Sequence, residues 1–175
     1  HADILSIDAD DARQMPGVRA IYTGADTADL KPIPTISPVT GVDGKLNVEP
    51  PRRILATDRV RHIGENVAIV IADSLEQACM ACEAVMVDYD ERPAVVDETD
   101  ALADSAPSVW DEAPGNLCYD WRAGDSAATD SAFAGAAHSV SLNYDGNRLH
   151  YAAVETRVAI ALPEGEGMTL YCPSQ

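Results

Sequence analysis

Apolar and polar positions in the first fifty residues predict two strands, a short helix and a long irregular stretch. Residues 3–7 have the apolar content of a strand, and residues 8–15 form a short helix with an aspartate-rich start. Pro-Gly at 16–17 ends that helix, and Val18–Thr23 is a second predicted strand. Residues 24–51 contain three glycines and five prolines, so we expect little regular structure there.

The clearest predicted unit lies between Gly64 and Tyr89, and we expect it to be the folding centre. Val67–Ala72 is a continuous apolar run, which predicts a strand buried on both faces. Ser74 is the predicted N-cap of a helix whose core face would carry Leu75, Ala78, Cys79, Cys82 and Val85. A strand over 85–89 follows. Helices and strands mix without steady alternation, which favours the α+β class.

The composition changes over 115–135, where Ala, Ser, Asp and Gly dominate. This stretch is typical of a connector, with one short helix through 132–134. Alternation over 137–144 predicts a strand, and 154–162 and 168–172 predict two more, joined by a tight turn. We therefore expect the chain to end in a three-stranded piece separate from the first unit.

The charge and the hydropathy limit the classes of function. The chain has 175 residues, of which 46% are hydrophobic, so it can bury a core. Its net charge of −17 would repel nucleic acid and anionic lipid headgroups, and both are poor candidates as partners. No apolar run reaches the roughly 20 residues of a membrane span, and the start does not resemble a signal peptide. With four scattered cysteines, a reducing, cytoplasmic location is expected.

Two features are candidates for chemistry, and each also has a structural interpretation. Cys79 and Cys82 form a CxxC motif, but a structural zinc site needs four ligands and no second motif stands nearby. We expect both thiols to be reduced, to lie in the core and to bind no metal. Glu155 lies within an apolar predicted strand. It is either an exposed strand residue or a functional carboxylate, and the sequence leaves both open.

Several stretches, in the same order along the chain, resemble the large subunit of the molybdenum hydroxylases. This family includes xanthine dehydrogenase, aldehyde oxidase and aerobic carbon monoxide dehydrogenase. The matching stretches are His1–Asp8, Met15–Asp26, Leu55–Ala68, Val87–Tyr89 with Pro93–Asp97, Ala113–Leu117, Asn147–Leu149, Val154–Arg157 and Tyr171–Gln175. In the third stretch Asn66 stands where the family usually has proline, a departure that should leave the strand intact. The resemblance covers essentially the whole chain.

The resemblance implies an α/β hammerhead domain followed by the first strands of a molybdopterin-binding domain. The expected boundaries are 1–115 for the hammerhead domain, 116–136 for the connector and 137–175 for the truncated start of the second domain. Gln175 matches a family glutamine that lies close to the molybdenum and hydrogen-bonds to a metal-bound oxo group. An amide suits that role because it donates a hydrogen bond without adding charge. Gln175 is the one expected cofactor-binding residue, with no catalytic residue and no metal ligand in this segment.

The implied parent enzyme hydroxylates an aldehyde or heteroaromatic carbon with water, or oxidises carbon monoxide; the substrate stays open. The resemblance places molybdopterin in the full-length parent, and iron–sulfur clusters and FAD on partner subunits. No cofactor is expected on this segment alone, since the family's glycine-rich loop and general-base glutamate lie downstream. The segment alone should therefore be inactive. A non-catalytic hammerhead module for interaction or assembly is the alternative, and the oligomeric state stays open.

Overall fold

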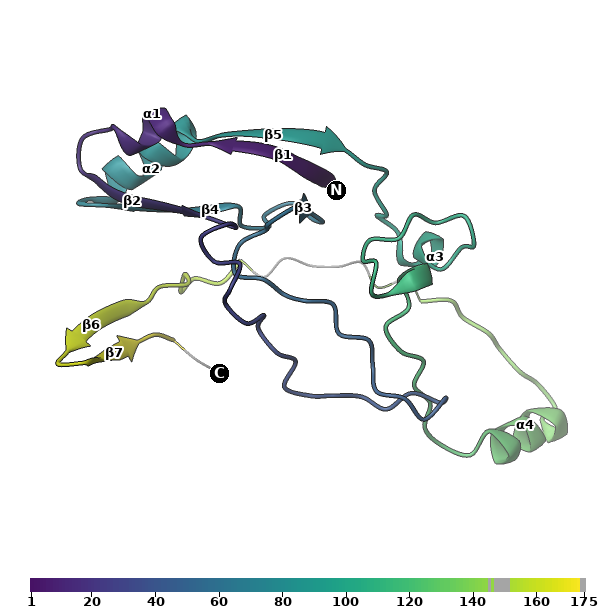
Figure 1. Ribbon diagram of the computed structural model, residues 1–175. Helices are drawn as coiled ribbons and strands as arrows, with labels where there is room; N and C mark the ends of the chain where they lie inside the picture. Colours follow the sequence, from purple (N-terminus) through teal and green to yellow (C-terminus); the bar gives the residue numbers. More distant parts are fainter. Residues whose placement is uncertain (145, 147–151, 174–175) are drawn as a thin grey trace. The chain divides into compact units, whose positions relative to one another are not determined.

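The computed structural model describes residues 1–144, 146 and 152–173, and the chain divides into two compact units, His1–Gly124 and Asp125–Gln175 (Figure 1). In chain order the elements of the first unit are β1 (Ala2–Asp8), α1 (Asp10–Arg13), β2 (Val18–Thr23), β3 (Arg59–Val60), β4 (Ala68–Ala72), α2 (Leu75–Ala84), β5 (Met86–Glu91), α3 (Glu98–Ala101) and the 3-10 turn η1 (Pro114–Asn116). Those of the second unit are α4 (Ser126–Gly135), β6 (Ile160–Glu164) and β7 (Gly167–Tyr171).

Two antiparallel sheets organise the first unit. One has the strand order β3-β1-β5, and the other pairs β2 with β4. The strand–helix–strand unit β4–α2–β5 is present as predicted, but its two strands belong to different sheets (Figure 1). Antiparallel strands combined with helices confirm the predicted α+β class.

The core of the first unit lies where α1 and α2 pack against the β2–β4 sheet. Its buried residues are Ala9, Ala12, Ile21 and Ala81. Three of these four are alanines, and such small side chains let the two helices lie close to each other and to the strands. The core is therefore thin, with Ile21 as its one large buried side chain.

The capping of α2 agrees with the sequence, but the orientation of the helix does not. The Ser74 hydroxyl accepts a hydrogen bond from the Gln77 N–H at 3.2 Å, which confirms the predicted N-cap. Ala81 is buried, whereas Cys79 and Cys82 are exposed. The prediction that both cysteines lie in the core is wrong. Each cysteine directly follows an alanine of the face that packs on the sheet. Because successive residues of an α-helix are rotated by about 100°, the cysteines point away from that face.

The β2–β4 sheet is covered on one face only, so the prediction that Val67–Ala72 is buried on both faces is wrong. Ile21 pairs with Val70 on the covered face, and Tyr22 pairs with Ile69 on the other. Tyr22, Ile69 and Ile71 are 44%, 42% and 45% exposed. A run of apolar residues fits a strand buried on both faces, but here no element of the unit covers the second face.

Two glycines are required where the chain turns or makes a close contact. Gly17 has a φ of +82° and lies in the turn that leads from α1 into β2. The helix itself is shorter than the predicted 8–15, because it ends at Arg13, before the Pro-Gly pair. A Cβ atom on Gly24 would clash with the carbonyl oxygen of Ala56. This contact brings the end of β2 against the buried pair Leu55 and Ala56.

Residues 24–51 form the irregular excursion that their glycines and prolines predict. Isolated bridges join Ile33 to Arg52 and Thr40 to Leu46. The excursion also contacts 118–120, because the Val48 N–H donates to the Cys118 carbonyl at 2.8 Å. Backbone pairing of this kind holds the long loop without a regular sheet.

The second unit differs from its prediction in three ways. Residues 137–144 are exposed and form no strand, and α4 spans ten residues where we expected a short helix. β6 begins at Ile160 and not at 154, so the described residues of this unit form a hairpin in place of the three predicted strands. The predicted tight turn is present as the two-residue loop Gly165-Glu166, with a φ of +59° at the glycine.

Candidate functional site

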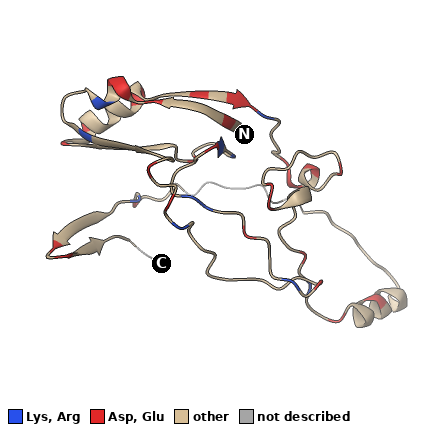
Figure 2. Cartoon of the chain, viewed as in Figure 1, with Lys and Arg blue, Asp and Glu red and all other residues tan. Residues whose placement is uncertain are grey.

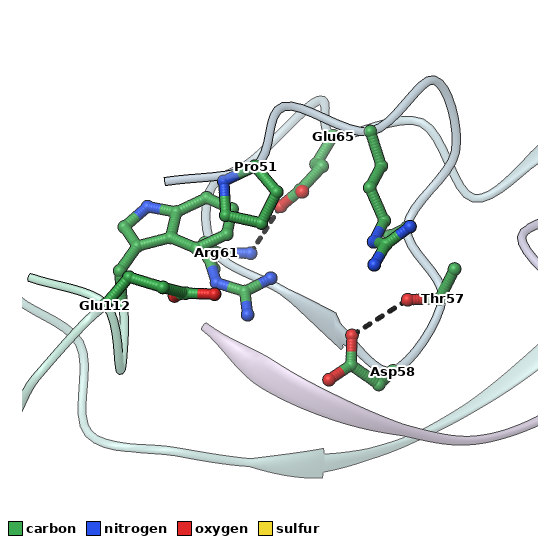
Figure 3. Close-up of a pocket in the computed structure, with 9 residues that line it drawn as sticks. Pro51, Thr57, Asp58, Arg61, Glu65 and Glu112 are labelled. Carbon is green, nitrogen blue, oxygen red and sulfur yellow. Dashed lines mark hydrogen bonds between the residues drawn. The ribbon is translucent and has the colours of Figure 1, made fainter. Parts of the chain in front are cut away.

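The segment Leu55–Ala68, which carries the family resemblance, surrounds a small pocket in the first unit (Figure 3). The Arg61 guanidinium lies 3.7 Å from the centroid of the Trp110 ring, a cation–π contact. Its Nε donates to the Val109 carbonyl at 3.2 Å and its Nη1 to the Arg59 carbonyl at 3.1 Å. The Glu65 carboxylate accepts from the Arg61 backbone N–H at 2.5 Å. Arg61 therefore ties two stretches of chain that lie 48 residues apart.

Asn116 organises the far side of the same region. Its backbone has a φ of +57°, a left-handed conformation that asparagine tolerates better than most residues. Its side-chain oxygen accepts from the Val109 N–H at 2.9 Å. Its amide donates to the carbonyls of Ala101 at 2.9 Å and Pro107 at 3.1 Å. One side chain thus holds the stretch from α3 to η1 in place.

A charged cluster at Asp3 joins β1 to β3 and to Arg92, the residue that follows β5. The Asp3 carboxylate accepts from Arg59 Nε at 2.5 Å and from Arg92 Nη1 at 2.6 Å. The Arg59 side chain is only 15% exposed, so water screens this pair less than a fully open one. The hydrogen bonds from Arg59 and then Arg92 hold the pKa of Asp3 below its ordinary value. The same contact raises the pKa of Arg59.

The pocket beside Arg61 is too small for a cofactor. Its volume is about 90 Å³, whereas sites for small molecules usually measure about 300–1,000 Å³. A wider depression of about 350 Å³ lies between 41–48 and 117–120. The charged side chains at its rim are already paired, Lys45 with Asp43 and Arg122 with Asp120. Neither hollow is a built catalytic pocket.

The candidate residues from the sequence are not brought together. Gln175 lies outside the described residues, so its predicted role stays a prediction. Glu155 is exposed in a bend before β6, and the expectation that it lies within a strand is wrong. Within 1–144, 146 and 152–173 no three His, Cys, Asp or Glu side chains gather as metal ligands. None of the helices in this part of the chain is long and apolar enough to cross a bilayer.

Sequence reasoning missed Arg61, Trp110 and Asn116 as a connected group. A signal was present, because the chain has only two tryptophans and Asn116 follows a Pro-Gly pair. Their spacing along the chain, however, does not predict a contact. Only the fold shows that the two family stretches Leu55–Ala68 and Ala113–Leu117 are held together through one arginine and one asparagine.

Comparison with known families agrees with this arrangement. Residues 1–93 match the family described as aldehyde oxidase and xanthine dehydrogenase, a/b hammerhead domain. Residues 109–175 match the molybdopterin cofactor-binding domain. The first match covers more than half of the chain. The chain belongs to the aldehyde oxidase and xanthine dehydrogenase family, which places it in the class of the molybdenum hydroxylases. It consists of a hammerhead domain followed by the start of a molybdopterin-binding domain.

Individual members of this family can also be compared with the chain. The carbon monoxide dehydrogenase large chain of Hydrogenophaga pseudoflava is 36% identical over all of this chain and 22% of its own length. The nicotine 6-hydroxylase large subunit of Paenarthrobacter nicotinovorans is 32% identical over 92% of this chain and 19% of its own. Among solved structures, carbon monoxide dehydrogenase from Oligotropha carboxidovorans is 30% identical with a TM-score of 0.60, covering 78% of this chain and 17% of that one. The chain spans about a fifth of these relatives.

The described residues do not by themselves form a binding site for a molybdenum cofactor. No polar or charged side chain is buried among them, and the pocket beside Arg61 is smaller than such a group requires. What they form is a scaffold, in which ion pairs and hydrogen bonds connect the stretches that the family shares.

Proposed function

We propose that this chain is the hammerhead segment and the start of the cofactor-binding domain of a molybdenum-hydroxylase large subunit. The observation that carries the proposal is the collinear match of both family descriptions, 1–93 and 109–175, to one short chain. In this proposal residues 1–115 form the hammerhead domain, 116–136 the connector and 137–175 the start of the second domain.

The proposed part of this chain in the reaction is positional. The molybdenum cofactor, when bound to the parent enzyme, supplies the hydroxylation chemistry. Gln175 would donate a hydrogen bond to that cofactor, since an amide N–H can do so without adding a charge. The tie from Arg61 to Trp110 and Val109 would hold the hammerhead segment against the chain that leads into the second domain. No catalytic base is assigned within the chain, and alone it should be inactive.

The proposed substrate is an aldehyde or heteroaromatic carbon hydroxylated with water, or carbon monoxide. Relatives named for carbon monoxide and for nicotine are similarly distant, at 36% and 32% identity, so identity does not choose between these classes. We propose iron–sulfur and FAD subunits as partners, together with the remainder of the large subunit, in the cytoplasm. The acidic surface, with a net charge of −17, argues against nucleic acid as a partner.

The test is to purify the full-length protein that contains these residues, with its partner subunits, and to measure its molybdenum content. Turnover is then assayed with an aldehyde, a purine, an N-heteroaromatic compound and carbon monoxide, with an artificial electron acceptor. We expect about one molybdenum per large subunit and turnover with one substrate class. Full occupancy by iron–sulfur and flavin partners without any molybdenum would contradict the proposal and support the non-catalytic assembly module.

A further inference from the structure

Helix α2 presents two thiols to solvent on the same side. Cys79 and Cys82 are both free and both exposed, whereas Ala81, on another face of the same helix, is buried in the core. Burial was the reason to assign the pair a structural role, and the fold removes that reason. Residues three apart on a helix are surface neighbours, with Cβ atoms about 5–6 Å apart.

This spacing favours a bridging ion over a disulfide. A disulfide needs its Cβ atoms about 3.5–4.5 Å apart, closer than a regular helix places residues i and i+3. A metal ion bound linearly by two thiolates places the sulfurs about 4.6 Å apart, taking roughly 2.3 Å for each metal–sulfur bond. Side-chain rotation alone can produce that separation, so α2 can stay intact.

The number of ligands selects the kind of ion. Zinc requires four ligands, and in the described part of the chain no third His, Cys, Asp or Glu joins these two. Soft thiolates prefer Cu(I) among the first-row metals, and a d¹⁰ monovalent ion is satisfied by two such ligands. The carboxylates of Glu76 and Glu83 on the same helix, together with the net charge of −17, favour the approach of a cation.

We propose that Cys79 and Cys82 form a two-coordinate site for a soft monovalent metal ion, Cu(I) in particular, on the exposed side of α2. Two sulfur–metal bonds form, the two thiol protons pass to solvent, and no electron is transferred. The proposal uses no residue to which the proposed function assigns a role, so it stands or falls independently of that function.

The test supplies Cu(I) to the whole chain, reduced and under anaerobic conditions, with bicinchoninate as a coloured competitor. We expect the chain to remove one equivalent of copper from the competitor. Cys79→Ser and Cys82→Ser should each weaken binding at least tenfold, whereas the double variant C118S/C172S should bind as the wild type does. Circular dichroism establishes that the serine variants keep their helix content, and X-ray absorption of the bound copper should show two sulfur neighbours. Zinc should be lost on dialysis.

Three results with the 175-residue chain would overturn the proposal. The first is a wild-type chain that takes no copper from bicinchoninate. The second is undiminished binding by Cys79→Ser or Cys82→Ser, and the third is loss of binding in the C118S/C172S control. In the full-length subunit, failure of both thiols to react with a small alkylating reagent under native conditions would also exclude the site, because it would show that α2 is covered there.

Discussion

At the scale of single residues, Ile21 and Ile69 show that apolar character does not establish burial. Both lie on the β2–β4 sheet, on opposite faces, and they are 5% and 42% exposed. Removing buried methylene groups costs the lost transfer free energy and leaves a cavity, whereas at a half-open position water fills the gap. The two residues should therefore contribute very differently to stability.

We predict that Ile21→Ala lowers the free energy of unfolding by about 2–5 kcal/mol and that Ile69→Ala lowers it by about 1 kcal/mol. Burial of Val67–Ala72 on both faces, as expected from the sequence, would give Ile69→Ala a cost of about 2–5 kcal/mol, and the exposure of Ile69 lowers that value. Urea unfolding followed by far-UV circular dichroism measures both, with each variant the other's control. Equal losses would show that the outer face of the sheet is covered in solution.

Asp3 makes the stability of the first sheet depend on pH. Its pKa is depressed by Arg59 and Arg92, so the folded state binds the proton less tightly than the unfolded state does. The stabilisation is fully present above the ordinary carboxyl pKa of about 4. It is lost as the pH falls through the lower pKa of the folded state.

We predict that Asp3→Asn lowers the urea midpoint at neutral pH, because it removes the negative charge that pairs two arginines. The difference between wild type and variant should shrink as the pH falls from about 5 towards about 2, where Asp3 becomes protonated in both states. Asp43→Asn is the matched control, since Asp43 pairs with an exposed lysine at 3.7 Å and should change little. A constant difference at all pH values would contradict the role of the Asp3 charge.

Substitution of a single residue, Gln175, tests the proposed function. Gln175→Ala in the full-length enzyme should leave assembly and molybdenum content largely intact but reduce turnover about three- to tenfold. This range corresponds to the roughly 0.5–1.5 kcal/mol of one neutral hydrogen bond. Gln175→Glu, which keeps the size but adds a charge, should reduce turnover further. Wild-type turnover in the alanine variant would refute the assignment of Gln175 but not the family.

At the scale of elements, the segment from α3 to η1 depends on side chains more than on regular structure. Apart from one turn of helix at each end, the stretch over 98–116 is irregular, and Asn116 makes three hydrogen bonds across it. An irregular segment with few buried groups opens easily when such a contact is lost.

We predict that Asn116→Ala speeds amide hydrogen exchange across 98–116 and destabilises the first unit by about 1–3 kcal/mol. The backbone N–H of Val109 and two carbonyls lose their partner, and alanine also adopts the left-handed conformation less readily. Asn47→Ala, which removes a single acceptor from the excursion at 39–47, is the control and should leave 98–116 unaffected. Exchange is measured by mass spectrometry, and unchanged rates over 98–116 would contradict the role of Asn116.

The β6–β7 hairpin differs from the irregular segment over 98–116. The sequence predicts its turn clearly, but the hairpin has no core of its own. Ile160 and Tyr171 face each other in one pair, and Ala161 and Leu170 in the next. Both faces of the hairpin therefore carry apolar side chains, and Ile160, Leu170 and Tyr171 are more than half exposed. An isolated hairpin is only marginally stable in water. Its composition is typical of inner strands of a larger sheet.

At the scale of the whole molecule, the chain has few large buried side chains. Among the described residues only Ile21 and Leu55 are both buried and larger than alanine. Acidic residues are spread over several elements, and the tip of β5 is one clear group (Figure 2). A thin core together with a net charge of −17 implies a marginally stable chain when it is alone.

We predict that the 175-residue chain, expressed alone, retains no molybdenum and shows no hydroxylase activity with aldehydes, purines or carbon monoxide. One neutral hydrogen bond from Gln175 is far too weak to hold a cofactor, and the described residues offer no pocket of sufficient size. Elemental analysis and substrate assays measure this, with the full-length protein as the positive control. Turnover by the isolated chain would refute the assignment of the chemistry to the rest of the subunit.

Local signals in the sequence determined the elements and the family. Apolar runs place β1, β2 and β5, Pro-Gly at 16–17 forms the turn before β2, Ser74 begins α2, and Gly165 forms the hairpin turn. Each of these depends on the conformational preferences of neighbouring residues, which a sequence displays directly. The collinear family motifs are also a property of the chain alone. Where alternation was the only signal, as at 137–144, the prediction failed, and none of the described strands pairs with that stretch.

Tertiary structure alone decided which of these residues are covered and which come together. Small alanines rotate α2 so that Cys79 and Cys82 face solvent, and packing on one face leaves Ile69 open. The contacts of Arg61 with Trp110 and of Asp3 with Arg92 join residues 49 and 89 positions apart. Such contacts depend on how whole elements pack, which residue patterns constrain only weakly, because many chain paths satisfy the same local preferences.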